Sequence, residues 1–348
     1  MSIDDTHDFF IQWHITERCN LQCLHCYQEG QKGEELSLSD IKKVIGEASD
    51  MMWTWEERYG VKLSTSYNIS GGEPFLRDDI FYMLEEIAWT GADIYVLSNG
   101  TLINREIARR LADIRVNGVQ ISIEGTQEIH DEIRGKGSFR AAMTGIDNLL
   151  NAGLTVTLNS TLSRLNARCF PDLLGLAKTV GAQRVGFSRL VPYGRGSAML
   201  DKMLSSDEVG KLYSEIFALE AAPLKIVTGD PVASQSTLAA PDEDLGDTPI
   251  GGCAAAVSGL TILSDGTVVP CRRLNVPLGN VRTDSLREIW AASPVLEALR
   301  DRNRYGDKCR LCKRWAGCRG CRAIAYAYSK ANGAENYLAE DPQCFIEQ

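Results

Sequence analysis

Three cysteines occupy the stretch "CNLQCLHC", and their spacing is the first feature of this chain that could carry chemistry. Cys19, Cys23 and Cys26 are separated by three residues and then by two. An odd set of thiols cannot pair fully into disulfides, and a structural zinc site takes four ligands. Two alternatives remain: zinc with His25 as a fourth ligand, or a cubic 4Fe-4S cluster whose three thiolates leave one iron open. An open iron has room for a ligand that chelates through an amine and a carboxylate.

Further cysteines gather near the C-terminal end, at spacings that suit metal ligation. They are Cys253, Cys271, Cys309, Cys312, Cys318, Cys321 and Cys344. Two zinc ribbons would use almost all of these thiols, and that is the structural alternative to iron-sulfur clusters. The remaining cysteine, Cys169, stands alone, and we expect it to be a small buried hydrophobe.

Composition limits the classes of protein to consider. The 348 residues are 44% hydrophobic and 24% charged, which suits one large or two modest globular domains. The N-terminus lacks the basic and apolar regions of a signal peptide, so we expect a cytoplasmic protein whose thiols stay reduced. No run approaches the ~18 apolar residues of a membrane span, so no membrane association is expected. A net charge of −9 argues against general nucleic-acid binding, which depends on basic residues.

Apolar runs alternate with amphipathic stretches from residue 10 to about 220, and this pattern predicts six strand-then-helix units. The expected strands cover residues 10–16, 64–70, 93–98, 118–123, 154–160 and 184–190. Such units predict an α/β fold with a parallel sheet and right-handed crossovers. At this length we expect a partial (β/α)6 barrel of the triosephosphate isomerase kind. A flat doubly wound sheet is the alternative, although no glycine-rich dinucleotide turn follows the first strand.

Polar segments follow five of the expected strands. "CNLQCLHC" follows the first, "GGEP" the second, "SNGT" the third, "SIEG" the fourth and "VPYGRG" the sixth. Active sites in barrels lie where the strands end. We therefore expect these segments to meet at one rim and to form a ligand site there.

The pattern C-x3-C-x2-C after the first strand, with "GGEP" after the second, closely resembles the radical S-adenosylmethionine (radical SAM) enzymes over residues 10–220. The resemblance implies that Cys19, Cys23 and Cys26 hold a 4Fe-4S cluster, whose open iron binds the amine and carboxylate of S-adenosylmethionine. It also implies a reductant such as flavodoxin or ferredoxin. Reductive cleavage would then give a 5'-deoxyadenosyl radical, which abstracts a substrate hydrogen in oxidoreductase- or lyase-type chemistry.

The same resemblance implies a set of residues around S-adenosylmethionine. They are Gly71, Gly72, Glu73, Pro74, Ser98, Asn99, Ser122 and Arg134. The two glycines would let the backbone approach closely, Glu73 would face the ammonium group, and the proline would fix the turn. Arg134 would pair with the methionyl carboxylate, the alternative being a surface ion pair with Asp131. Turn capping is an equal alternative for the serines and the asparagine.

The C-terminal cysteine spacing resembles the SPASM domain of many radical enzymes, over residues 251–348. The resemblance implies two auxiliary clusters, and therefore three 4Fe-4S clusters in all. The nearer auxiliary cluster would be held by Cys253, Cys271 and Cys321, and the farther one by Cys309, Cys312, Cys318 and Cys344. The fourth position of the nearer cluster stays open between water, a side chain other than cysteine, and substrate.

These patterns predict three regions: a barrel over residues 1–220, an acidic linker or bridging segment over 221–250, and the SPASM domain over 251–348. A hairpin is expected around Asp265 and Gly266. Residues 300–322 carry nine Lys or Arg against two Asp. This basic run would compensate the negative charge of thiolate-ligated clusters, dock an anionic substrate, or do both.

Peptide-modifying members commonly have three residues between the last two clustered cysteines, whereas "CRGC" has two. The shorter form, with "RAIAYAY" and "AEDPQC" after it, resembles the branch that trims tetrapyrroles. Only eighteen residues precede Cys19, so a peptide or protein substrate would need a separate leader-recognition protein or recognition by the barrel itself.

The first expectation for function is maturation of a peptide, protein or peptide-derived cofactor. The alternative is tailoring of tetrapyrrole side chains in a haem pathway, and a non-enzymatic electron carrier is remote. No catalytic acid or base is singled out. Asp230, Tyr193 and Arg189 lie near expected strand ends, but structural roles explain them equally well.

Overall fold

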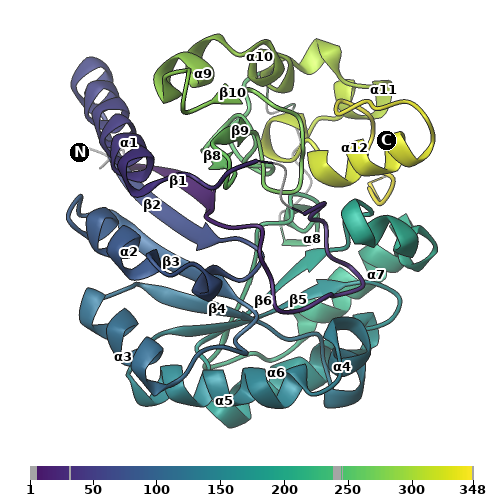
Figure 1. Ribbon diagram of the computed structural model, residues 1–348. Coiled ribbons are helices and arrows are strands. Elements are labelled where there is room, and N and C mark those ends of the chain that lie inside the picture. The colour runs from purple at the N-terminus through teal and green to yellow at the C-terminus, as the bar shows by residue number, and fades with distance from the viewer. Residues whose placement is uncertain (1–5, 31–32, 238–243, 245, 347–348) are drawn as a thin grey trace, which may run out of the picture.

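The computed structural model describes residues 6–30, 33–237, 244 and 246–346. Its centre is a sheet of parallel strands that follow one another in chain order, with helices packed on the outside (Figure 1). These strands are β1 (Thr6–His14), β2 (Lys62–Ser70), β3 (Asp93–Ser98), β4 (Gly118–Ser122), β5 (Val156–Leu162), β6 (Arg184–Arg189) and β7 (Lys225–Thr228). The connecting helices are α1 (Leu38–Tyr59), α2 (Ile80–Ala88), α3 (Arg105–Ile114), α4 (Gln127–Arg134), α5 (Ser138–Asn151), α6 (Phe170–Val180) and α7 (Ser206–Ala218). Short 3-10 turns lie between them: η1 (Pro74–Leu76), η2 (Ala167–Cys169) and η3 (Gly194–Lys202).

Local sequence signals begin and end these elements. The hydroxyl of Ser37 accepts from the backbone N–H of Asp40, whose side chain accepts in return from the backbone of Ser37, so a capping box begins α1. Gly60 ends α1 in the left-handed conformation, with φ of 64°. Along β5, buried residues alternate with partly exposed ones, the period expected of a strand with one face in the core.

The C-terminal part of the chain joins the same sheet. Its elements are β8 (Gly259–Ile262), β9 (Thr267–Val269), β10 (Gly279–Asn280), α8 (Ser234–Thr237), α9 (Leu286–Ala292), α10 (Pro294–Arg300), η4 (Arg302–Arg304), α11 (Asp307–Arg310), η5 (Trp315–Gly317) and α12 (Arg322–Ala331). The strand order is β10-β9-β8-β1-β2-β3-β4-β5-β6-β7, and β8 runs parallel to β1. In Figure 1 the green and yellow elements α9 to α12 lie together at the β8 to β10 side of the sheet. The sheet is therefore an open barrel extended at its first strand.

The six expected strands are confirmed as β1 to β6, and the α/β partial barrel with its cysteine-rich C-terminal region is confirmed. The hairpin is also confirmed, since β8 and β9 pair antiparallel around Gly266, with φ of +87°. Part of the expected linker, residues 238–243 and 245, lies outside the described residues. The rest of it contains β7, which pairs with β6. That strand spans four residues and gives little periodic signal, and the division of the chain at residues 220 and 250 stays a prediction.

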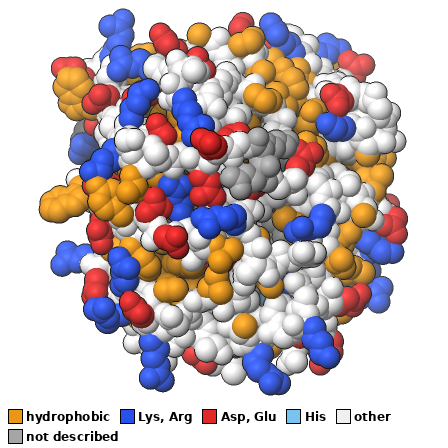
Figure 2. All heavy atoms as spheres, viewed as in Figure 1, with side chains coloured by type: hydrophobic (Ala, Val, Ile, Leu, Met, Phe, Trp, Pro, Cys, Tyr) orange, Lys and Arg blue, Asp and Glu red, His pale blue; other side chains and the backbone are white. Residues whose placement is uncertain are grey.

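Acidic and basic side chains are interspersed over the face seen in Figure 2. No helix in the described part of the chain combines the length and the apolarity that crossing a membrane requires.

Candidate functional site

The strand ends and the loops after them enclose an open cavity of about 920 Å³. Most of the predicted site residues line it: Cys19, Cys23, Cys26, Gly71, Gly72, Ser98, Asn99, Ser122 and Arg134. Residues from the segment after β6 reach the same cavity, among them Val191 and Arg195. The convergence expected from parallel strands is therefore observed, while the ligand contacts of these residues stay predictions.

Backbone hydrogen bonds hold the loop that carries Cys19, Cys23 and Cys26. The N–H of Gly72 donates to the carbonyl of Thr16 at 2.8 Å, and the N–H of Glu73 donates to the carbonyl of Arg18 at 2.8 Å. A Cβ on Gly71 would overlap the carbonyl oxygen of Thr16, and one on Gly72 would overlap that of Arg18. The glycines of "GGEP" are thus required where this segment packs against the loop after β1. This packing role is separate from the predicted role of letting the backbone approach S-adenosylmethionine.

The other side of this loop is held by α4 and by the segment after β6. The N–H of Leu24 donates to the carbonyl of Ile133 at 2.8 Å, and the N–H of Gly196 donates to the carbonyl of Cys26 at 3.0 Å. Both contacts are between backbone groups. The loop is therefore held in place by the barrel itself.

Nitrogen donors surround the sulfur atoms. The N–H of Leu21 lies 3.4 Å from Sγ of Cys19, Nδ2 of Asn99 lies 4.0 Å from the same sulfur, and Nη1 of Arg134 lies 3.8 Å from Sγ of Cys23. Burial raises the pKa of both thiols, so each stays neutral until a metal replaces its proton. Donors and a cation beside the sulfurs fit an anionic, thiolate-ligated cluster. Within the described residues, no three His, Cys, Asp or Glu side chains are arranged to hold a single metal ion.

Glu73 lies behind the cavity and is fully buried, with 0% of its surface exposed. Its carboxylate accepts from the hydroxyl of Ser98 at 2.8 Å and from the backbone N–H of Asn99 at 2.8 Å. Burial raises its pKa to about 7, although these hydrogen bonds oppose the rise. Pro74 begins the short turn η1 directly after it. Glu73 therefore orders the "SNGT" turn, and its predicted contact with an ammonium group stays a prediction.

Glu124, in the "SIEG" segment, is not among the predicted site residues, yet it joins several parts of the site. Its buried carboxylate accepts from Arg134 at 2.5 and 2.8 Å and lies 2.9 Å from Nε2 of His25. It also accepts from the backbone N–H of Thr161 at 2.9 Å. Burial opposes ionisation, but Arg134 and His25 outweigh it and hold the pKa of Glu124 well below its ordinary value. A charged residue at a strand end was the only signal for this role in the sequence.

These contacts decide two of the alternatives raised by the sequence. Arg134 pairs with Glu124, while Asp131 accepts from the backbone N–H groups of Gly137 and Phe139, so the surface ion pair between Arg134 and Asp131 is not formed. His25 directs Nε2 at Glu124, which disfavours its use as a zinc ligand.

The predicted ligands of the farther auxiliary cluster meet in a separate cavity of about 420 Å³. Cys309, Cys312, Cys318 and Cys344 all line it. The N–H of Gly320 donates to Sγ of Cys318 at 3.4 Å, and burial raises the pKa of Cys309 to about 11. The chain thus brings together four thiols that lie up to 35 residues apart (344 − 309).

The predicted ligands of the nearer auxiliary cluster lie between two small apolar clusters. Cys321 belongs to one, Cys253 to the other, and Cys271 packs against both. The guanidinium of Arg273 lies near Cys321 and Cys271, and although burial alone would lower its pKa, these thiols raise it. Burial raises the pKa of Cys321 to about 12. The backbone N–H of Cys253 donates to the carbonyl of Cys318 at 3.1 Å, so the two cysteine groups adjoin.

Buried guanidinium nitrogens without partners surround both groups of C-terminal cysteines. Among the described residues, Nε of Arg273, Nε of Arg319, and Nε and Nη2 of Arg322 have no hydrogen-bond partner. Arg319 and Arg322 are 1% and 0% exposed. Burying an unpaired charge is costly, so these side chains need an anionic neighbour. Thiolate-ligated clusters fit that requirement, which favours charge compensation as the role of this part of the basic run.

A buried ion-pair network ties the barrel to the C-terminal tail. Arg189, at the end of β6, donates to Asp230 at 2.6 Å and to Asp341 at 2.8 Å. Asp341 also accepts from the backbone N–H of Cys321 at 2.8 Å. Arg189 and Asp230 therefore connect the strand ends to an expected cluster ligand. The hydroxyl of Tyr193 instead accepts from Asn275 at 3.3 Å, in a second cavity next to the first.

Cys169 is partly exposed, so the expectation that it is buried is wrong. It lies at the end of η2, and its Cβ packs against Gly125, whose lack of a side chain leaves it room.

Two family models match the chain. The model of the radical SAM superfamily matches residues 13–177, and that of the SPASM family, described as an iron-sulfur cluster-binding domain, matches residues 253–321. The matched ranges contain the N-terminal cysteine loop and most of the C-terminal cysteines.

Curated relatives match almost the whole chain. A protein of Methanosarcina barkeri (strain Fusaro), named AdoMet-dependent heme synthase, is 31% identical over 349 residues, covering 96% of this chain and 95% of the relative. The mycofactocin maturase MftC of Mycolicibacterium smegmatis is 29% identical and covers 91% of this chain and 78% of the relative.

A solved structure shares the fold. SuiB of Streptococcus suis, crystallised with S-adenosylmethionine, superposes with a TM-score of 0.75 at 18% identity, covering 98% of this chain and 78% of that one.

Proposed function

Because this chain belongs to the radical SAM superfamily and carries a SPASM domain at its C-terminal end, we propose that it is an enzyme that tailors the side chains of a tetrapyrrole in a haem pathway. The observation that carries this proposal is the end-to-end similarity to a heme synthase, which covers 96% of this chain and 95% of the relative. The order of the two leading expectations is thereby reversed, since peptide maturation ranked first from the sequence.

Radical SAM enzymes use a 4Fe-4S cluster and S-adenosylmethionine, which together supply, when bound and reduced, a 5'-deoxyadenosyl radical that abstracts hydrogen. We assign the cluster to Cys19, Cys23 and Cys26, which share one loop at the open cavity. Arg134 and Asn99 stabilise the thiolates by placing nitrogen donors near their sulfurs.

Polar groups in the cavity are assigned to S-adenosylmethionine. Ser98, Asn99 and Ser122 present hydroxyl and amide groups at neighbouring strand ends. Glu124 holds Arg134 in place, so that the guanidinium lies at the cavity wall next to Cys23. Glu73 holds the turn at Ser98 and Asn99 from behind. Ser98, Asn99 and Arg134 are thus each positioned by a buried carboxylate.

The C-terminal cysteines are assigned to two auxiliary clusters, for a total of three 4Fe-4S clusters. The unpartnered nitrogens of Arg273, Arg319 and Arg322 support this assignment, because they supply positive charge beside the thiols. A small electron-transfer protein such as flavodoxin or ferredoxin would be the reductant.

Peptide maturation is the second candidate. It is supported by the relative MftC, named a mycofactocin maturase, which is 29% identical over 91% of this chain. A peptide substrate would bring in a leader-recognition protein as a further partner.

The test starts from protein reconstituted with iron and sulfide without oxygen. We expect about twelve irons per chain and release of 5'-deoxyadenosine from S-adenosylmethionine under reducing conditions. Titration with iron coproporphyrin III, followed by absorbance, should then show saturable binding. S-adenosylmethionine cleavage without any tetrapyrrole binding would contradict the proposal and favour the peptide candidate. Zinc in place of iron would contradict the cluster assignment as well.

A further inference from the structure

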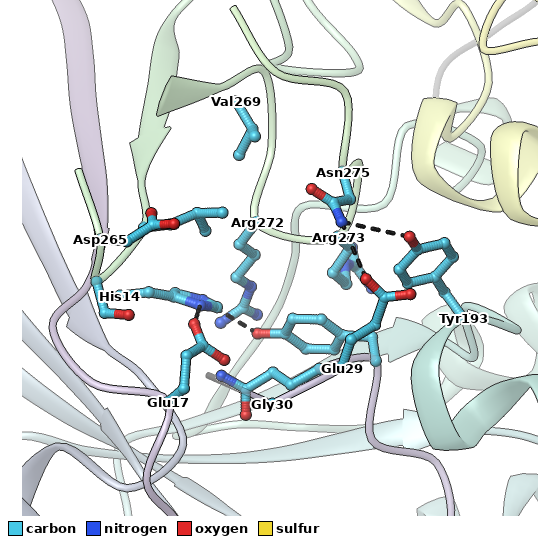
Figure 3. A pocket seen from close by; sticks show the side chains of 14 residues that line it. His14, Glu17, Glu29, Gly30, Tyr193, Asp265, Val269, Arg272, Arg273 and Asn275 are labelled. Atoms are coloured by element: carbon cyan, nitrogen blue, oxygen red, sulfur yellow. Dashed lines mark hydrogen bonds and ion pairs between the residues drawn. The ribbon is translucent and has the colours of Figure 1, made fainter. Parts of the chain in front are cut away.

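A second chamber of about 560 Å³ opens beside the cysteine cavity, between the barrel and the C-terminal region. It is formed by the end of β1, the loop after Cys26, the hairpin between β8 and β9, and the segment after Cys271 (Figure 3). The two cavities share the residues Tyr27, Gln28, Arg272 and Arg273 in their linings. A ligand in the second chamber therefore adjoins the site assigned to S-adenosylmethionine.

The acidic side chains of this chamber already have partners. Glu17 lies 3.9 Å from Nδ1 of His14, and Glu29 accepts from the amide of Asn275 at 3.2 Å. Asp265 accepts from the backbone N–H of Thr267 at 3.0 Å and so caps the hairpin turn. None of these carboxylates forms an ion pair with Arg272 at 4 Å or less among the contacts that the structure gives.

Arg273, one of the two arginines of the chamber, is committed to the protein. Its Nη1 donates to the carbonyl of Arg189 at 3.3 Å, and its guanidinium lies near Cys321 and Cys271. It belongs to the surroundings of the nearer auxiliary cluster.

Arg272 differs from its neighbour. Its guanidinium forms no hydrogen bond or ion pair with any residue that the structure describes, and its contact is with the ring of Tyr27, 6.0 Å from the ring centroid. Figure 3 shows its side chain extending from its loop into the middle of the chamber, between His14 and Glu29. Arg272 is partly buried, and its guanidinium nitrogens are not among the buried atoms that lack a partner, so they stay accessible to a ligand in the chamber. A second donor on the shared wall, Nε2 of Gln28, is buried without a partner among the described residues.

We propose that Arg272 binds a carboxylate of the substrate where the two chambers meet. A guanidinium binds a carboxylate through two parallel hydrogen bonds, which fixes its position as well as its charge. Leu263 and Val269 give the chamber an apolar wall for the carbon skeleton. This inference rests on the proposed function, because a tetrapyrrole with propionate side chains combines an apolar ring with carboxylates. If Arg272 binds a propionate, the edge of the ring that carries this propionate lies next to the S-adenosylmethionine site.

The test compares two probes that differ in charge. Iron coproporphyrin III has four propionates, and its tetraamide keeps the ring but lacks the negative charges. Each is titrated without oxygen into the reconstituted enzyme and into the variants R272Q and R272K. We expect R272Q to bind the acid about 10- to 100-fold more weakly, and R272K to lose less, because it keeps the charge but not the paired donors. Binding of the tetraamide should change less than about twofold.

The matched control is R304Q, which removes an arginine from a surface ion pair with Asp301, away from the chamber. We expect it to bind both probes as the wild type does. Binding of S-adenosylmethionine, measured separately, should weaken less in R272Q and R272K than binding of the acid does, although Arg272 lines both cavities. Unchanged affinity for the acid in both Arg272 variants would overturn this inference and leave the proposed function standing. Failure of the wild type to bind either probe would instead overturn the proposed function.

Discussion

The N-terminal and C-terminal cysteines of this enzyme differ in how far apart in the chain the members of each group lie. Cys19, Cys23 and Cys26 share an eight-residue loop that the barrel holds by backbone hydrogen bonds. The C-terminal cysteines come from separate segments between Cys253 and Cys344, and buried arginines with unpartnered nitrogens lie among them. In the first set Cys19 is exposed, Cys26 is partly exposed and Cys23 is buried, whereas none of the C-terminal cysteines is exposed: three are buried and four are partly exposed. The difference indicates that the first site is built to admit a ligand, and that the C-terminal sites hold the fold together.

Replacing each set of cysteines by alanine tests this difference directly. Of the changes considered, these replacements have the largest expected effect. With Cys19, Cys23 and Cys26 all changed to Ala, S-adenosylmethionine cleavage should fall below detection and about a third of the iron should be lost. The melting temperature should change by less than about 2 °C, because the loop is held by the barrel. With Cys309, Cys312 and Cys318 changed to Ala, a similar share of iron should be lost and the melting temperature should fall by about 5 °C or more.

Iron analysis and thermal melting of anaerobically prepared protein provide these measurements. The control is C169A, because Cys169 stands apart from both sets, and it should keep its iron and its melting temperature. Equal loss of thermal stability from the two sets would contradict the contrast drawn between them.

A change at Glu124 tests whether the open site depends on one buried carboxylate. E124Q should lower the free energy of unfolding by about 3–5 kcal/mol, because it leaves Arg134, whose side chain is only 10% exposed, without its countercharge. It should also weaken S-adenosylmethionine binding about tenfold or more, since Arg134 and His25 lose their common anchor. Denaturant unfolding and ligand titration measure the two effects. E128Q, on the exposed side of α4, is the matched control.

If E124Q unfolds as the wild type does, the guanidinium of Arg134 must find another partner, and Glu124 is not the anchor of the site. Loss of stability with unchanged ligand affinity would limit Glu124 to a structural role.

The smallest expected effect is a pH dependence of the stability that Glu73 contributes. It tests the contrast between Glu73, which burial keeps protonated, and Asp341, which an arginine keeps ionised. Burial raises the pKa of Glu73 from 4.5 to about 7, so the unfolded chain releases this proton first as the pH rises. The contribution of Glu73 to stability therefore falls between pH 4.5 and 7 by up to about 3 kcal/mol. Asp341, on the C-terminal side, behaves oppositely, because Arg189 outweighs burial and lowers its pKa.

The measurement is the free energy of unfolding of E73Q minus that of the wild type, without S-adenosylmethionine. This difference should grow as the pH rises from 4.5 to about 7, because the wild type loses the contribution of Glu73 and E73Q does not. It should grow less with S-adenosylmethionine bound if an ammonium group faces Glu73, as predicted. A difference independent of pH would show that Glu73 does not titrate there, and E132Q, an exposed change on α4, should show none.

Much of the barrel could be predicted because its signals are local. The strand β3 has the predicted bounds, and polar segments after parallel strands had to meet at one edge. The strand β7 was not predicted, since four residues carry almost no periodicity. The pairing of β8 with β1 was not predicted either, because the partners lie about 250 residues apart.

The sequence by itself determined the chemistry: the spacing of Cys19, Cys23 and Cys26, with "GGEP" after the next strand, indicated a three-thiol cluster with an open iron. Only the tertiary structure decided which charges meet. Glu124 joins Arg134 and His25, and Arg189 joins Asp230 and Asp341, whereas Arg272 faces the ring of Tyr27 and forms no ion pair with a residue that the structure describes. The physical reason is that ligand spacing within a loop is set by neighbouring residues, whereas the pairing of buried charges depends on elements far apart in the chain.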